Sequence, residues 1–145
     1  MKQAIESHRG MLRAVAIAAF SLTLYSGLAF GESVKVTLSG DQEVPAVKTS
    51  ASGSGTITIN DDKTVSGSVK TTGVKGTMAH IHEAPAGKNG PVIIPLTKSG
   101  DGTWSVPAGA KLNDDQYKAF KNGDLYVNVH SDAHKAGEIR AQLKP

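Results

Sequence analysis

The stretch DLYVNVHS, residues 124–131, carries the pattern that decides the fold. Two sets of side chains alternate along it, an apolar set and a polar set: Leu125, Val127 and Val129, and Tyr126, Asn128 and His130. Because every second side chain of a β-strand points to the same face, this alternation predicts a strand with one apolar and one polar face. The apolar face is expected to pack into a core and the polar face to meet solvent.

The same alternation recurs in short segments on both sides of this stretch. Each segment is four to eight residues long and is bordered by Gly, Asn, Asp or Pro. The segments are SVKVTLSG (33–40), SGTITIND (54–61), TVSGSVKT (64–71), TMAHIHE (77–83), PVIIPLT (91–97), TWSVP (103–107) and GEIRAQL (137–143). Many short strands with frequent turn signals predict an all-β fold, an antiparallel β-sandwich or Greek-key barrel. Residues 40–55, rich in small side chains, are expected to form a loop at one end of it.

A single helical pattern interrupts the strands. In NDDQYKAFKNG (113–123), Asn113 can cap a helix and Gln116 stands where a capping box requires it. Gly123 is suited to end the helix. We therefore predict one short helix near residues 113–122, with a structural role as a connector.

The first 31 residues have the features of a secretory signal peptide. Basic residues precede an uncharged apolar run over 14–30, and small residues suited to cleavage follow it. The expected cut comes after Gly31, with Ala29 as the alternative, which leaves a domain of residues 32–145. A membrane anchor is the competing interpretation, but the run is short and contains several polar residues. The domain is thus expected to be periplasmic or secreted, without membrane attachment after cleavage.

Composition excludes several classes of function for residues 32–145. Arg140 is the only arginine there, and the positive charge of the whole chain comes largely from residues 1–31. A nucleic-acid partner is therefore not expected. The chain has no cysteine, so disulfides and thiolate metal sites are excluded and any metal must be bound by imidazole, thioether or oxygen. No serine–histidine–acid arrangement stands out, and no catalytic residue is assigned.

The histidines of the domain fall in two short segments. His80 and His82 alternate with apolar residues in TMAHIHE, and His130 ends the stretch quoted first, with His134 four residues later. If the two strands are neighbours, His80, His82 and His130 meet on the outer face of a sheet and can bind one ion, with copper expected and zinc as the alternative. His134 and Met78 are candidate additional ligands, since thioether sulfur favours the cuprous ion.

The metal interpretation has one alternative and one further requirement. The histidines can instead brace the loop EAPAGKNGPV (83–92) without any metal. If a metal is bound, the second nitrogen of each imidazole needs a carbonyl or a carboxylate as partner, and Glu83, Asp124 and Asp132 are possible carboxylates for this role.

Several of these motifs together resemble the CHRD domain, a family named after chordin and common in exported bacterial proteins. The segments that carry the resemblance are SGDQEVPAV, HIHEAPAGKNGPVIIPL, GDLYVNVHS and GEIRAQL. The resemblance implies an all-β sandwich of immunoglobulin-like or superoxide-dismutase-like type over about residues 33–143. HIHE is also similar to the H-V-H-E strand of copper–zinc superoxide dismutases. This second likeness implies copper ligation by His80, His82 and His130, without a counterpart of the zinc subsite.

Three functions follow from these observations. The leading hypothesis is an exported copper-binding domain for copper buffering, transfer or sensing. The second is a non-catalytic structural or protein-interaction module with structural histidines. The third is a redox enzyme of dismutase type, so enzymatic activity is left open, with a non-enzymatic role favoured. The expected partner is a metal ion, and another periplasmic protein or a second copy of the chain would suit such roles.

Overall fold

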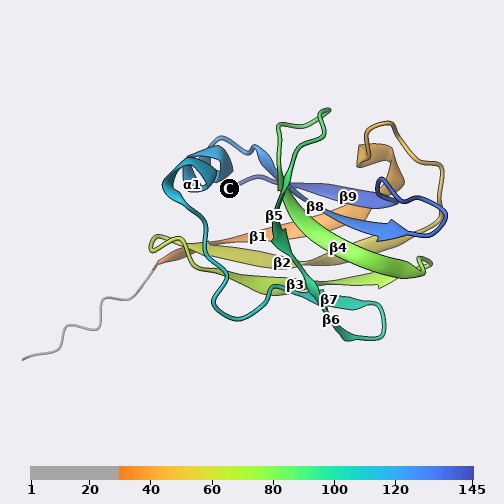
Figure 1. Ribbon diagram of the computed structural model, residues 1–145, viewed down its shortest axis with the longest axis horizontal. Helices are drawn as coiled ribbons and strands as arrows, with labels where there is room; N and C mark the ends of the chain where they lie inside the picture. The colour runs from red at the N-terminus through yellow and green to blue at the C-terminus, as the bar shows by residue number, and fades with distance from the viewer. Residues whose placement is uncertain (1–29) are drawn as a thin grey trace, which may run out of the picture.

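A computed structural model describes residues 30–145 of the chain (Figure 1). The expected signal peptide therefore lies almost wholly outside the described residues. Nine strands belong to one sheet in this part of the chain. They are β1 (Gly31–Ser39), β2 (Ser52–Asn60), β3 (Val65–Thr72), β4 (Gly76–Glu83), β5 (Val92–Pro95), β6 (Thr97–Gly100), β7 (Thr103–Ser105), β8 (Leu125–Ser131) and β9 (Ile139–Leu143).

The sheet folds over on itself into two layers. Its strand order is β5-β4-β8-β9-β1-β2-β3-β7-β6, and neighbouring strands pair antiparallel. β1 and β9 pair at a single register position, Ser39 opposite Arg140, so the sheet turns there from one layer into the other. Figure 1 shows β1, β2 and β3 beneath β4, β8 and β9. The predicted all-β antiparallel sandwich or barrel is confirmed.

The hydrophobic core lies between the layers and contains the apolar sets that the sequence predicts. Leu38, Ile57, Ile81 and Val127 have no exposed surface. Their burial, at about 1.5–3 kcal/mol for each side chain of this size, is the main stabilising contribution in a domain without disulfides. Trp104 of β7 is also buried in this cluster.

The helical prediction is confirmed as α1 (Asp114–Lys121), which lies at one end of the sandwich (Figure 1). The Asn113 side chain accepts a hydrogen bond from the Gln116 backbone, and the Gln116 side chain accepts one from the Asn113 backbone. Phe120 anchors the helix to the core with no exposed surface. Gly123 follows the helix with φ = 78°, a conformation that glycine adopts without steric cost.

The predicted loop over residues 40–55 is longer than the connection in the structure. The 3-10 turn η1 (Gly40–Gln42) follows β1, but β2 begins at Ser52 and pairs with both β1 and β3 from that residue on. Small residues are present here because the strands approach closely. A Cβ atom added to Gly55 would lie 2.1 Å from the Ser68 carbonyl oxygen. Glycine at this position therefore belongs to strand packing and does not indicate a loop.

The outer face of β8 and of the adjoining part of β9 is covered, which the sequence did not lead us to expect. All seven residues of β8 are buried, on both faces of the strand. The connections 40–51 and 84–91 are linked to each other and to this face. The Asn89 side chain donates to the Val44 carbonyl, and the Gln142 side chain donates to the Ala84 carbonyl. The expectation of a solvated outer face was wrong for β8.

Candidate metal centre

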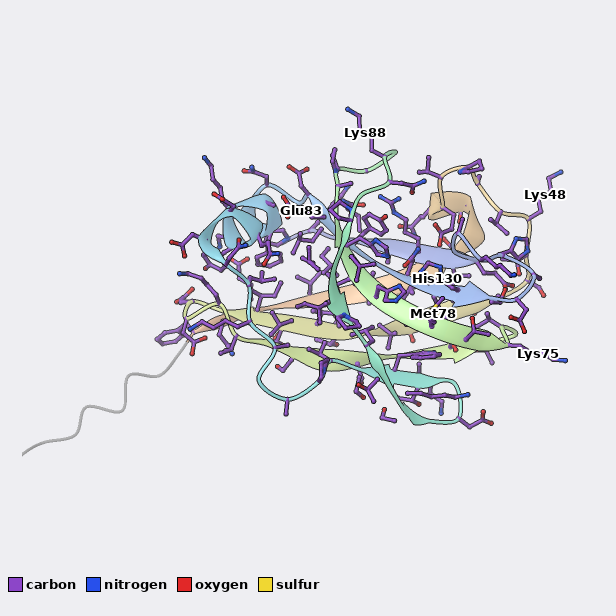
Figure 2. All side chains as sticks on the ribbon, in the orientation of Figure 1. Lys48, Lys75, Met78, Glu83, Lys88 and His130 are labelled. Carbon is purple, nitrogen blue, oxygen red and sulfur yellow. The ribbon has the colours of Figure 1, made fainter. Side chains whose placement is uncertain are left out.

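The site is built on the two central strands of the upper layer. β4 and β8 pair antiparallel, with Met78 opposite His130, His80 opposite Asn128 and His82 opposite Tyr126. Because alternate residues share a face, the histidines lie on the outer side of the sheet, away from Ala79 and Ile81, which face the core. Figure 2 shows Met78 and His130 on these neighbouring strands. The predicted face of the sheet is therefore correct.

Three imidazoles converge on this face. One nitrogen each from His80, His82 and His130 lies within 4.8 Å of the others. Nitrogens that share one ion, each at roughly 2.0–2.1 Å from it, lie about 3–4 Å apart. Closing the cluster on a metal thus requires side-chain movements of about 1 Å. The three residues fit a metal-binding role.

Backbone carbonyls orient two of the imidazoles. His82 Nδ1 lies 2.9 Å from the Gly90 carbonyl oxygen, and His130 Nδ1 lies 2.9 Å from the Lys135 carbonyl oxygen. A carbonyl oxygen only accepts, so each Nδ1 donates its hydrogen and each Nε2 keeps its lone pair for another partner. The sequence allowed a carbonyl or a carboxylate in this role, with Glu83, Asp124 and Asp132 as possible partners; for these two rings the partners are main-chain carbonyls of two loops.

The other ring nitrogens of the cluster differ in whether they have a hydrogen-bond partner. His80 Nδ1 donates to His130 Nε2 across 3.0 Å, whereas the buried His82 Nε2 has no hydrogen-bond partner. Asn128, whose buried Oδ1 also has no partner, acts on His82 and opposes the lowering of its pKa. A buried polar atom without a partner is costly, and a ligand can satisfy it. The unpaired His82 Nε2 thus supports the metal interpretation.

The electrostatics of the cluster favour neutral imidazoles. Burial, with the neighbouring His130 and His82, lowers the pKa of His80 from 6.5 to about 4. Burial also lowers the pKa of His82. Neutral imidazole is the form that coordinates metals, so protons compete weakly for these two rings at neutral pH.

An aromatic stack that the sequence interpretation missed supports one side of the cluster. The His82 ring lies parallel to that of Tyr126, with centroids 4.7 Å apart and planes 3° apart. The Arg140 guanidinium carbon lies 3.4 Å from the centre of the Tyr126 ring. The Tyr126 hydroxyl accepts a hydrogen bond from the Gly90 N–H, next to the carbonyl that orients His82. The alternation in DLYVNVHS already places Tyr126 on the same face as His130. This was the signal from which an aromatic side chain beside the cluster could have been predicted.

The two other candidate ligands take different positions. Met78 is 49% exposed and lies directly opposite His130. His134 lies in the turn after β8, where its backbone N–H bonds Ser131, and it is not part of the group of three imidazoles. Three of the five candidates are thus brought together, and Met78 borders them.

These features define a class of protein: a disulfide-free β-sandwich domain with a three-histidine cluster on one outer sheet face. The CHRD domain family model matches residues 34–143, and the chain therefore belongs to the CHRD domain family. No curated protein and no solved structure matches the chain, so the likeness to superoxide dismutases stays a prediction. Within residues 30–145, no helix has the length and apolar character needed to cross a membrane.

Proposed function

We propose that this domain binds a transition-metal ion through His80, His82 and His130, and that copper is its metal. The observation that carries the proposal is the buried, unpartnered Nε2 of His82 in a cluster of three imidazoles. Carbonyl oxygens hold the rings of His82 and His130 in the tautomer that leaves each Nε2 without a hydrogen. His82 Nε2 is free for a metal, whereas His130 Nε2 accepts from His80 Nδ1, a bond that must open when an ion is bound. This orientation is what a metal-binding histidine requires.

Copper is favoured over zinc by the chemistry of the donors. Copper(II) binds nitrogen sites more tightly than the other divalent metals of the first row. Met78 stands opposite His130 and adds a thioether, a soft donor suited to copper(I), at the exposed border of the site. Zinc also suits three imidazoles and is the alternative metal.

The role that we propose is copper buffering, transfer or sensing outside the cytoplasm. It rests on the signal-like residues 1–31 and on the accessibility of the cluster. His80 is partly exposed and Met78 is half exposed, so an ion can enter or leave beside them. An exported protein that delivers or receives copper is the partner that this role implies.

Competition titrations with chromophoric chelators test the site directly. Residues 32–145 are titrated with Cu(I), Cu(II) and Zn(II), and the variants His82→Ala and His130→Ala are compared with His134→Ala as the matched control. Loss of a ligand should weaken binding by more than the roughly 10- to 100-fold that outer-shell changes cost, while the control keeps its affinity. Unchanged affinity in both ligand variants would refute the proposed site.

A structural role is the second candidate, because His82 and His130 also tie the loops at Gly90 and Lys135 to the sheet. In this case chelators leave the melting temperature of the purified protein unchanged, and His82→Ala destabilises the metal-free protein. Melting curves with copper, with zinc and with chelator separate the two candidates. Stabilisation by a metal that disappears in His82→Ala supports metal binding.

A further inference from the structure

The buried positive charge behind the His82 ligand has no role in the function proposed above. We infer that Arg140 is a specificity-determining residue that favours Cu(I) over divalent ions. This role rests on the metal site proposed above. Arg140 acts by placing a fixed positive charge close to the bound ion. Arg140 thereby sets the relative affinity for two ions, whereas the three histidines form the site itself.

Three stacked groups connect Arg140 to the site. β8 lies between β4 and β9 in the sheet, so Tyr126 stands between His82 and Arg140. The two stacking distances, 4.7 Å and 3.4 Å, place the guanidinium carbon no more than about 8 Å from the centre of the His82 ring. An ion on His82 Nε2 therefore lies about 10 Å from this charge.

The charge of Arg140 is buried and is not neutralised by an ion pair. The side chain is 1% exposed. Its guanidinium donates to neutral oxygens, namely Oδ1 of Asn89, the Pro85 carbonyl and Oε1 of Gln142. Within residues 30–145 the two ion pairs involve lysines and not Arg140. Its field is thus screened less than that of a surface charge.

Two carboxyl groups lie in the same polar layer. Burial raises the pKa of Glu43 to about 7, so this group carries only part of its charge at neutral pH, and its Oε1 accepts from Asn128. Glu138 accepts from the hydroxyls of Thr49 and Ser131. Neither group forms an ion pair with Arg140 within the described residues. The positive charge of Arg140 nevertheless lowers the pKa of Glu43, so the partial charge of Glu43 offsets part of the field of Arg140.

Coulomb's law gives the size of the effect. At about 10 Å and an effective dielectric constant of about 20, one unit of charge on the ion changes its affinity by about tenfold. Cu(I) carries one such unit, whereas Zn(II) and Cu(II) carry two. Arg140 should therefore disfavour a divalent ion about tenfold more than it disfavours Cu(I).

The test compares two variants at Arg140. Arg140→Met keeps an unbranched apolar side chain and removes the charge, and Arg140→Lys keeps the charge. Cu(I) and Zn(II) affinities are measured at pH 7.5 by competition with bicinchoninate and with a zinc-binding dye. Lost hydrogen bonds to the loop affect both ions alike, so the ratio of the two affinities isolates the charge. Arg140→Met should shift the ratio about tenfold towards Zn(II), and Arg140→Lys should leave it near the wild-type value.

A second variant keeps the inference testable where Arg140→Met does not fold. Arg140→Gln also removes the charge but keeps a polar side chain that can donate to the loop oxygens, so the ratio should again shift about tenfold towards Zn(II). A ratio unchanged within threefold in the variant measured overturns the role of Arg140. Absence of any metal binding by the wild-type protein refutes instead the proposed site itself, and the two failures are thereby distinguished.

Discussion

Acidification should destabilise the metal-free protein, and His80 should account for a measurable share of the loss. The folded protein lowers the pKa of His80 from 6.5 to about 4, chiefly by burial. Between these pH values the unfolded chain binds a proton at this residue and the folded protein does not. Stability is therefore fully present above about pH 6.5 and is lost as the pH falls towards 4.

The magnitude follows from the size of this shift. At 1.36 kcal/mol for each unit of pKa, the full shift of His80 corresponds to about 3 kcal/mol. The imidazole is partly exposed, and solvent screening reduces the expected loss at pH 4.5 to roughly 1–2 kcal/mol. His82, whose pKa burial also lowers, adds to the total loss of the wild-type protein.

Urea unfolding in the presence of a chelator measures the effect. Free energies of unfolding are compared at pH 7.5 and 4.5 for the wild-type protein and for His80→Gln, which cannot be protonated. The variant should lose roughly 1–2 kcal/mol less between the two pH values, and His134→Gln serves as the control outside the cluster. An equal loss in wild type and His80→Gln would contradict the assigned cause.

Three further predictions concern the loop, the helix and the leader. Gly90→Ala should lower the free energy of unfolding by about 1–3 kcal/mol and weaken metal binding, because its Cβ would lie 1.8 Å from the Glu83 carbonyl oxygen and displace the carbonyl that orients His82. Urea unfolding and metal titration check both effects. Asn113→Ala removes the helix cap and should cost about 1 kcal/mol in a melting experiment, without changing metal affinity. Mass spectrometry of the exported protein should find an N-terminus directly after Gly31 or Ala29; an intact leader would refute the cleavage.

The convergence of three histidines was predictable because it depends on two local properties. The alternation in TMAHIHE and DLYVNVHS assigns each side chain to a face, and pairing of the two strands brings these faces together. The partners of the second imidazole nitrogens were not predictable in this way. They are the carbonyls of Gly90 and Lys135, and every residue has a carbonyl, so residue type says nothing about which one lies close.

The sequence by itself determined the strands, the capped helix, the apolar core and the candidate ligands. Each follows from a spacing of two or from a short capping motif, which are properties of neighbouring residues. Only the tertiary structure decided that the outer face of β8 is covered and that Arg140 lies behind His82 through Tyr126. These features arise where the connections 40–51 and 84–91 fold over the sheet. Such contacts join residues far apart in the chain, and no local pattern encodes them.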